Sequence, residues 1–260
     1  MKNNTRIGII GASGDLGSQM VVQACSTFED VSAFDIQQQP RQEALTGIDP
    51  SLLRKETLLS EPGFLTSVGE VMANSAVVHW CAPLEVLTDL EELPSDTLLI
   101  LHDSVMSNSL GAAEMLKSRT GTYGKIAIMH CLMSPENRVV VATESGEADF
   151  IAAHVTDLGL SPFQMSALEH DFVMAHSQAP FALLGQAIGP LLEEYESMGL
   201  LTTSAKELKH ALDSRAAQWT PETIKAILGN PQLLEFVRSL SDSLEQQAKL
   251  DGTINTNESR

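Results

Sequence analysis

Residues 6–17 read RIGIIGASGDLG, a short β-type run followed by three glycines with the spacing G-x-x-G-x-x-G. A helical pattern then continues to about Phe28. Glycines allow a tight turn and a close approach of the backbone to a pyrophosphate, whose charge the amides at a helix N-terminus stabilise. The order of strand, glycines and helix predicts a dinucleotide-binding turn, although glycines alone also fit a tight turn that binds nothing. The turn residues assigned to the cofactor site are Gly11, Ala12, Ser13, Gly14, Asp15, Leu16 and Gly17.

The residue that ends the second apolar run indicates which dinucleotide would bind. Asp35 directly follows the run at residues 31–34. A carboxylate in this position can accept hydrogen bonds from the adenosine ribose diol, and it repels the 2′-phosphate that distinguishes NADP from NAD. We therefore expect NAD to be the preferred cofactor. Pro83, which stops the run at residues 76–81, is also assigned to the cofactor site.

The pattern along the chain predicts an α/β domain at residues 1–147 and a helical domain at residues 148–260. In the first half, short apolar runs alternate with amphipathic stretches, which indicates a parallel sheet covered by helices on both faces. Strands are expected at 6–10, 31–34, 76–81, 97–102, 125–129 and 138–143, with helices at 65–72, 84–93 and 110–117. In the second half, helices are expected at 148–158, 169–198, 206–218, 221–228 and 231–247, a β-like segment at 161–165, and a frayed tail at 251–260.

The composition excludes several classes of protein. The 260 residues include 34 acidic and 16 basic side chains, a formal charge of -18 that argues against a nucleic-acid partner, because phosphate backbones would be repelled. No apolar run reaches the roughly 18 residues of a membrane span. The three cysteines, Cys25, Cys81 and Cys131, lack metal-ligand spacing and predict reduced thiols. With an N-terminus that leads directly into a strand, these features predict a cytoplasmic protein that binds neither metal nor membrane.

Side chains that could take part in catalysis stand where strands of the predicted sheet end. Open α/β sheets bind ligands at this edge. Ser104 follows the run at 97–102, and His130 follows the run at 125–129. A histidine near a nicotinamide can remove a hydroxyl proton while a hydride leaves the same carbon, so His130 is the candidate base. The structural alternatives are a loop histidine for His130 and a helix cap for Ser104.

The other histidines divide by their sequence surroundings. His170 opens the long helical stretch of the second domain and is a third candidate. His79 and His102 lie in apolar runs, and we expect them to be core or strand-end histidines. His154 and His210 have helical surroundings, and we expect both at the surface.

Three blocks of the chain resemble the prephenate/arogenate dehydrogenases. GIIGASGDLGSQM (residues 8–20) is similar to the nucleotide-binding turn of that family, in the G-x-x-G-x-x-G form of some members. MHCLMSPEN (residues 129–137) stands where the family has a strand followed by His-Pro-x-x-Gly. EHDFVMAHSQ (residues 169–178) resembles the His-Asp-x-x-Met-Ala-x-x-Gln signature, the most specific of the three blocks. The order and spacing of the blocks agree with the family.

The resemblance implies a Rossmann-type NAD-binding domain followed by an all-helical domain that binds substrate and forms a homodimer. It implies NAD-linked oxidative decarboxylation of prephenate to 4-hydroxyphenylpyruvate, a step of tyrosine biosynthesis, or of arogenate to tyrosine. By position, His130 corresponds to the histidine that holds the ring hydroxyl, and Ser104 to the serine of an Asp-x-x-Ser-Val-Lys block. The implied substrate-binding positions are His170, Gln178 and Lys206, with Arg215 as the alternative to Lys206 for the family's carboxylate-binding arginine.

The chain departs from the family pattern at several positions. Cys131 and Ser134 replace the proline and glycine of His-Pro-x-x-Gly. Leu101 and Met106 replace the acidic and lysine residues of the serine block. Lys206 can neutralise a carboxylate, but it lacks the bidentate fork of an arginine. Two alternatives therefore stay open: a dehydrogenase for another small hydroxy acid on the same two-domain plan, and a non-catalytic NAD-binding homologue.

Overall fold

The chain forms two compact units, Met1–Ala167 and Leu168–Arg260, in a computed structural model. The structure describes residues 5–36, 63–90, 92–120, 125–131, 138–143, 148–216, 219 and 221–257. Ser134, which replaces a glycine of the family pattern, lies outside the described residues.

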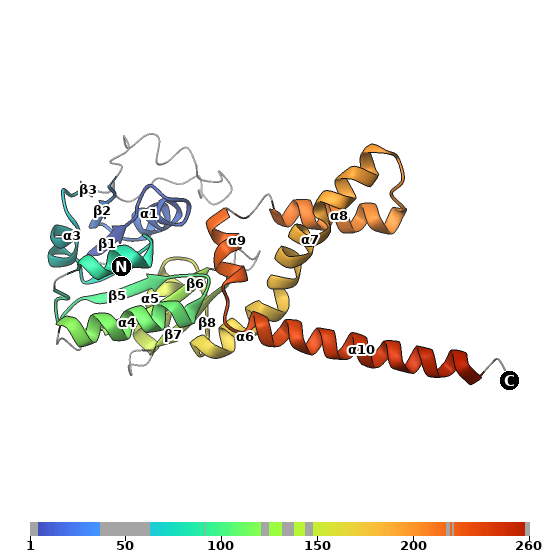
Figure 1. The fold of residues 1–260 in the computed structure, drawn as a ribbon. Helices are drawn as coiled ribbons and strands as arrows, with labels where there is room; N and C mark the ends of the chain where they lie inside the picture. The colour runs from blue at the N-terminus through green and yellow to red at the C-terminus, as the bar shows by residue number, and fades with distance from the viewer. Residues whose placement is uncertain are drawn as a thin grey trace. The chain divides into compact units, whose positions relative to one another are not determined.

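Eight strands of the described part form one sheet in the first unit, in the order β3-β2-β1-β4-β5-β6-β7-β8 (Figure 1). The strands are β1 (Ile7–Ile10), β2 (Val31–Phe34), β3 (Gly63–Phe64), β4 (Val77–Trp80), β5 (Leu98–His102), β6 (Lys125–Cys131), β7 (Arg138–Thr143) and β8 (Ser161–Gln164). The paired strands from β3 to β6 are all parallel. Each predicted run is confirmed as a strand, whereas the two-residue β3 has no apolar run that could have signalled it.

The last two strands of the sheet differ from the prediction. β7 runs antiparallel to β6, and β8 pairs in parallel with β7. Residues 132–137 between β6 and β7 are too few for the crossover of about a dozen residues that a parallel pair requires, so the chain reverses. β8 is the β-like segment that the sequence pattern placed in the helical domain. Because β8 pairs with β7, the first unit extends to Ala167, beyond the predicted boundary after residue 147.

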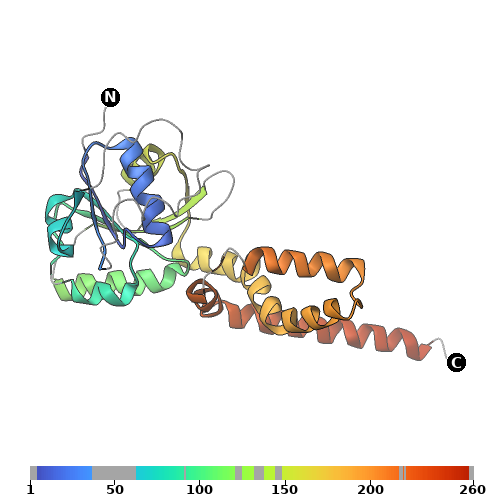
Figure 2. The same cartoon turned by 90° about the horizontal axis from the view of Figure 1, so that it is seen from above.

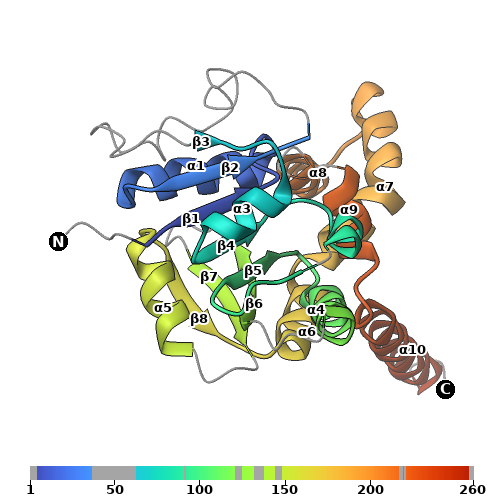
Figure 3. The same cartoon turned by 90° about the vertical axis from the view of Figure 1, so that its left-hand side faces the viewer.

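Helices cover both faces of the sheet, as predicted. α1 (Asp15–Thr27) and α5 (Ala148–Asp157) pack on one face, and α3 (Val68–Asn74), η1 (Leu84–Asp89) and α4 (Met106–Thr120) pack on the other (Figure 3). β4 shows why: Val77 belongs to the apolar cluster under α1 and α5, whereas Val78 and Trp80 belong to the cluster under α3 and α4. Successive side chains of a strand point to opposite faces, and both faces are buried here. The helix predicted at 84–93 is only the six-residue 3-10 helix η1.

The second unit is helical, as predicted (Figure 2). Its helices are α6 (Ala167–Ser177), α7 (Ala179–Ser197), α8 (Thr203–Ala216), α9 (Pro221–Leu228) and α10 (Leu233–Asn257). The helix predicted at 169–198 is divided at Gln178, because Pro180 in the first turn of α7 lacks the N–H that a helix interior uses. α10 continues to Asn257, where a frayed tail was predicted. Across the described helices, no stretch combines the length and the apolar character that spanning a bilayer requires.

A chain of three histidines lies in the core of the first unit. The Nδ1 of His79 on β4 lies 2.9 Å from the Nε2 of His102 on β5, and its Nε2 lies 2.9 Å from the Nε2 of His154 on α5. His79, His102 and His154 are 0%, 7% and 4% exposed. The positions predicted for His79 and His102 are confirmed, as is the exposed position of His210. The surface position predicted for His154 is wrong, because α5 packs on the sheet and sets this ring 5.6 Å from that of Phe28.

Burial keeps these histidines neutral at neutral pH. Desolvation, followed by the charges of His154 and His102, holds the pKa of His79 well below its usual range. Desolvation, with the charges of His130 and His154, lowers the pKa of His102 to about 3. Desolvation also lowers the pKa of His154 to about 4, against the opposing effect of the Asp157 carboxylate. Each ring therefore carries one N–H donor and one acceptor nitrogen.

We predict that the free energy of unfolding decreases as the pH falls below 6.5. The unfolded chain takes up protons at the three histidines near their ordinary pKa of about 6.5, whereas the folded chain resists protonation until the pH is much lower. Stability is therefore highest above pH 6.5, and at pH 5 the loss is about 2 kcal/mol for each histidine. Urea unfolding at pH 7 and pH 5, followed by circular dichroism, measures this loss.

Two single variants separate the contribution of the buried histidines to this loss of stability from the contribution of the carboxylates. His154→Gln should reduce the loss between pH 7 and pH 5 by about 2 kcal/mol, because one buried histidine is removed. His210→Gln should leave the loss unchanged, because His210 is exposed. The same pH dependence in the wild type and in both variants would contradict this account.

Candidate functional site

The backbone of the turn after β1 requires glycine at two positions. Gly11 has a φ of +80°, a left-handed conformation that other residues rarely adopt. A Cβ atom on Gly17 would lie 1.9 Å from the carbonyl oxygen of Gly11, so only a glycine at residue 17 lets α1 begin this close to β1. The N-terminus of α1 therefore packs directly on the end of β1, as the glycine spacing predicts.

The amides of this turn differ in their hydrogen-bond partners. Those of Gly11 and Ala12 donate hydrogen bonds to the carbonyl oxygen of Phe34, at 3.0 and 3.2 Å, and hold the turn against β2. Those of residues 15–17 form the first turn of α1, where N–H groups have no acceptor within the helix. An anion at this site would therefore be bound by the first turn of α1.

Asp35 is bonded directly to the glycine turn. Its carboxylate Oδ2 accepts a hydrogen bond from the backbone N–H of Ser13 at 2.9 Å, and the residue is only 9% exposed. This charge-assisted bond holds the end of β2 beside the turn after β1. The Oγ of Ser13 is buried and has no hydrogen-bond partner among the described residues. A buried, unpaired hydroxyl is unfavourable, so this atom fits a polar group of a dinucleotide.

The other candidates of the first unit also stand at the carboxyl ends of strands. Pro83 follows β4, half-buried Ser104 follows β5, and half-buried His130 lies near the end of β6. Because these strands are parallel to β1 and β2, the structure places them on the same edge of the sheet as the turn and Asp35. Open α/β sheets bind ligands beyond this edge.

The cysteines near this edge are not suited to act as nucleophiles. Burial raises the pKa of Cys131 to about 12. Burial, followed by the charge of Cys131, raises the pKa of Cys81 well above its usual value. Both thiols therefore stay protonated at neutral pH, and Cys131 adds no charge beside His130. None of the three cysteines, which all lie in the described part of the chain, forms a disulfide.

His170 of the second unit is held inside the protein. It is fully buried, and its Nδ1 lies 2.9 Å from the carboxylate Oδ1 of Asp171, which is also fully buried. The backbone carbonyl of Asp171 accepts a hydrogen bond from the side-chain amide of Asn230 at 2.8 Å. These contacts join α6 to the segment between α9 and α10. The His170–Asp171 pair therefore helps to hold α6 in place within the second unit.

The remaining substrate-site candidates lie on α7 and α8, which pack as an antiparallel hairpin (Figure 2). The carbonyl oxygen of Gln178 accepts the N–H of Phe181 at 3.1 Å, and the Arg215 guanidinium lies 5.7 Å from the centre of the Phe181 ring. Arg215 and Gln178 therefore both contact Phe181. Lys206 is exposed in the first turn of α8, near the tip of the hairpin, where Lys209 pairs with Glu196 at 3.3 Å.

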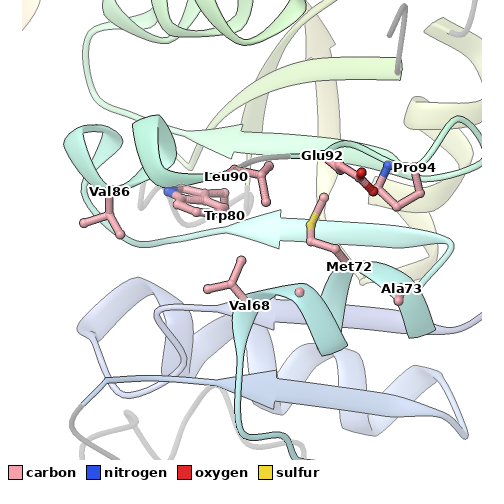
Figure 4. A pocket seen from close by; sticks show the side chains of 9 residues that line it. Val68, Met72, Ala73, Trp80, Val86, Leu90, Glu92 and Pro94 are labelled. Atoms are coloured by element: carbon pink, nitrogen blue, oxygen red, sulfur yellow. The ribbon is translucent and has the colours of Figure 1, made fainter. Parts of the chain in front are cut away.

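A separate groove lies within the first unit, on the face covered by α3 and η1 (Figure 4). Its volume is about 410 Å³, and its lining is apolar except for the carboxylate of Glu92. The lining residues are Val68, Gly69, Met72, Ala73, Trp80, Val86, Leu90, Glu92 and Pro94. None of these lining residues was predicted as a site residue. The candidate site stays at the strand ends, because the glycine turn, Asp35 and the other candidates of the first unit share that edge of the sheet.

Several contacts around the site were not predicted from the sequence. The position of Asp35 after β2 was the signal for its bond to Ser13, but spacing alone does not show which amide it would accept. His154 carried no signal because its helix was assigned to the wrong unit. Asn230 stands in a Gly-Asn-Pro segment that indicates only a helix end, so its bond to Asp171 had no sequence signature.

Comparison with known proteins gives matches at the level of structure. No protein-family model matches the chain, and no curated protein is significantly similar to it. A prephenate dehydrogenase from A. aeolicus, in complex with hydroxyphenyl propionate and NAD+, shares 15% identity at a TM-score of 0.66, over 98% of this chain and 93% of that chain. The Synechocystis arogenate dehydrogenase shares 17% identity at a TM-score of 0.67, over 95% and 92%.

A third solved structure extends the comparison to another substrate. An NAD+-dependent 5-formyl-3-hydroxy-2-methylpyridine 4-carboxylic acid 5-dehydrogenase shares 16% identity at a TM-score of 0.54, over 94% of this chain and 81% of that chain. At these identities the likeness shows a common fold. The predicted fold class and the resemblance noted in the sequence are thereby confirmed: the chain has the fold of the prephenate and arogenate dehydrogenases.

Proposed function

We propose that this chain is an NAD-dependent dehydrogenase that converts prephenate to 4-hydroxyphenylpyruvate by oxidative decarboxylation. The observation that carries the proposal is the 2.9 Å hydrogen bond from the Ser13 amide to the Asp35 carboxylate. This bond sets a carboxylate suited to a ribose diol beside a turn suited to phosphate. The three sequence blocks and the shared fold support the choice of substrate.

The first unit contains residues that fit NAD. The pyrophosphate would be bound by the amides of residues 15–17 and by the hydroxyl of Ser13. The adenosine ribose diol would donate hydrogen bonds to Asp35, and Pro83 would border the cofactor beyond β4. Bound NAD supplies the acceptor for a hydride.

His130 and Ser104 would act on the hydroxyl-bearing carbon of the substrate. His130 would take the hydroxyl proton as the hydride leaves the same carbon, and a general base typically contributes about 10²–10⁴-fold to the rate. Ser104 would donate a hydrogen bond that orients either His130 or the hydroxyl. Loss of carbon dioxide from the opposite ring carbon then makes the ring aromatic and leaves a phenolate, which would take the proton back from His130. The loss of carbon dioxide renders the reaction irreversible.

Arg215 is the better candidate for the residue that binds the substrate carboxylate. It lies at the end of α8 that returns to the start of α7, where Gln178 of the signature block stands. Lys206 lies at the far end of the same helix. A guanidinium can also hold a carboxylate through two parallel hydrogen bonds, which an ammonium cannot. We therefore assign the carboxylate to Arg215 in place of Lys206.

A second candidate function is oxidation of arogenate or of another small hydroxy acid. The likeness to a pyridine-carboxylic acid dehydrogenase favours this alternative, because a similar fold there serves a different ring acid. NADH formation with prephenate, and separately with arogenate, distinguishes the two substrates. A chain that binds NAD and oxidises neither would be a non-catalytic homologue or an enzyme for another acid.

We also propose that the second unit forms a homodimer. α10 exposes Leu234, Val237, Leu240 and Leu244, whose spacing of three or four places them on one side of the helix. The buried apolar cluster of this unit is small, with Ala179, Ala182, Ile227 and Leu233 as its members. A second copy of the chain would cover the exposed side chains of α10.

The cofactor assignment predicts tighter binding of NAD than of NADP. Replacing Asp35 by alanine should narrow the difference between the affinities for NAD and NADP, because the carboxylate that repels a 2′-phosphate is lost. Fluorescence titration of each cofactor measures the two affinities. Asp30→Ala is the matched control, since this exposed aspartate lies before β2 rather than after it. Tighter binding of NADP to the wild type would refute the assignment.

The assignment of the base predicts that His130→Asn lowers turnover about 10²–10⁴-fold and leaves the NAD affinity within a few-fold. The reason is that His130 would touch the substrate and not the pyrophosphate. Steady-state NADH formation with prephenate and a separate NAD titration provide the two readouts. His210→Asn, at an exposed position, is the control. Turnover of His130→Asn near the wild-type level would show that this histidine is structural.

The homodimer proposal predicts a particle of twice the chain mass by light scattering at micromolar concentration. Leu240→Lys combined with Leu244→Lys should yield monomers, because two charges would be buried in the apolar contact. Ser243→Lys lies on another side of α10 and should leave the dimer intact. A monomeric wild type would rule out this assembly.

A further inference from the structure

The apolar groove of the first unit has a floor and two walls (Figure 4). Val68 and Met72 of α3 belong to one wall, and Val86 of η1 belongs to the other together with Leu90, which ends that helix. Trp80, the last residue of β4, is 1% exposed and forms the floor. The groove therefore lies over a face of the sheet, whereas the candidate cofactor site lies beyond the carboxyl edge.

Hydrogen bonds hold both walls of the groove in place. Ser67 caps the start of α3, and the hydroxyl of Thr97 donates to the carbonyl oxygen of Ser75, just beyond the end of α3, at 3.0 Å. The guanidinium of Arg119 on α4 donates to the carbonyl oxygen of Leu90 at the end of η1. The walls could close over the groove only by breaking these bonds, so the groove is a preformed cavity of the kind that binds small molecules.

The volume of the groove suits a small organic molecule. It is about 410 Å³, whereas an engineered apolar cavity of about 150 Å³ already binds benzene. Pockets that bind small ligands usually measure about 300 to 1,000 Å³. A molecule with one aromatic ring and a short chain therefore fits the groove.

One carboxylate interrupts the apolar lining. Glu92 is the only charged side chain among the lining residues, and it forms no ion pair within the described part of the chain. Figure 4 shows its carboxylate at the end of the groove near Pro94, and the Trp80 indole at the end near Val86. The lining therefore combines an apolar surface along the groove with a negative charge at one end.

This charge distribution determines which class of ligand the groove would accept. The Glu92 carboxylate repels an anion, and the chain as a whole carries a formal charge of -18. A neutral apolar molecule would gain nothing from the carboxylate, whereas an ammonium group would form a charge-assisted hydrogen bond with it. The groove therefore favours a cation over a neutral molecule, and a neutral molecule over an anion.

We propose that this groove binds a small organic amine with an aromatic body. The ammonium group pairs with Glu92, and the ring packs on Trp80 between the walls that contain Met72 and Leu90. Contact between two aromatic rings adds to the free energy gained by burying their apolar surface. The proposal does not rest on the dehydrogenase function, because the groove contains none of the residues assigned to the cofactor or the substrate.

Tryptophan fluorescence measures binding in the groove. The chain has two tryptophans, and Trp219→Phe leaves Trp80 as the only one. Titration of this variant with 4-phenylbutylamine should give a saturable change in fluorescence in the millimolar range, because the ring of the probe would pack on the indole. The neutral 4-phenylbutanol, which is the same size, should bind about two- to fivefold more weakly, the effect of one exposed ion pair. Equal affinities for the two probes would show that the groove does not recognise the amine.

A pair of charge variants tests the role of Glu92. Both are made in the Trp219→Phe background and change one exposed glutamate to glutamine. Glu92→Gln should abolish the preference for 4-phenylbutylamine over 4-phenylbutanol, because the partner of the ammonium group is lost. Glu114→Gln, on α4 and outside the groove, should retain it. Equal loss of the preference in both variants would assign it to the overall charge of the chain and overturn the ion pair.

A pair of glycine variants locates the bound probe. Gly69→Leu should weaken both probes about tenfold or more, because the new side chain would fill part of the groove. Gly111→Leu, on α4, is the matched control and should leave both affinities unchanged. A Cβ atom at either position meets no heavy atom closer than 3.9 Å, so both variants should fold.

Two results would reject the proposal. One is the absence of any saturable change in the fluorescence of Trp80 with 4-phenylbutylamine. The other is wild-type affinity in Gly69→Leu, which would place the probe elsewhere on the protein. NADH formation tests the dehydrogenase function separately, so a failure of that function leaves the result for the groove unaffected.

Discussion

The approach of Gly17 to the carbonyl oxygen of Gly11 is the constraint on which the rest of the first unit depends. A side chain at residue 17 would overlap that oxygen, so α1 can begin this close to the end of β1 only with a glycine at residue 17. The same turn is then tied to β2 by the Ser13 amide and the Asp35 carboxylate. With these two contacts in place, the first-turn amides of α1 and a carboxylate are held side by side at one edge of a parallel sheet. That edge also receives Ser104 and His130.

The buried strands near this edge are stabilised in two ways, by apolar side chains and by hydrogen bonds between buried histidines. Both faces of β4 and β5 are buried, which normally requires continuous apolar side chains. His79 and His102 break that rule, and the cost of burying them is offset by hydrogen bonds within the histidine chain. Buried polar networks of this kind favour one arrangement of the core only if nearly all of their atoms are paired. The unpaired Nδ1 of His102 is the exception, and it lies at the functional edge.

The sequence predicted the parts of this structure that depend on local pattern. Apolar runs located the strands from β1 to β7 except β3, the glycine spacing located the turn, and the end of the second run drew attention to Asp35. The reversal at β7 and the inclusion of β8 in the sheet depend on connection length and on pairing between distant segments, which periodicity does not encode. The histidine chain was missed for the same reason: His79, His102 and His154 come from three separate elements. The placement of Arg215 beside Phe181 required the α7–α8 hairpin, which the sequence showed only as a long helix followed by another.

The second unit adds a constraint of a different kind. Its His170–Asp171 pair is fully buried, and Asp171 is bonded to Asn230 in the segment before α10. These two residues of the signature block therefore stabilise the fold of the second unit, whether or not they also bind a ligand. The proposed cofactor site and the roles of the residues around it all depend on a dinucleotide bound at the turn after β1. A crystal structure of the chain with NAD tests this most directly. We expect the pyrophosphate on the amides of residues 15–17 and the ribose diol on Asp35. NAD bound elsewhere, such as in the apolar groove between α3 and η1, would contradict the account.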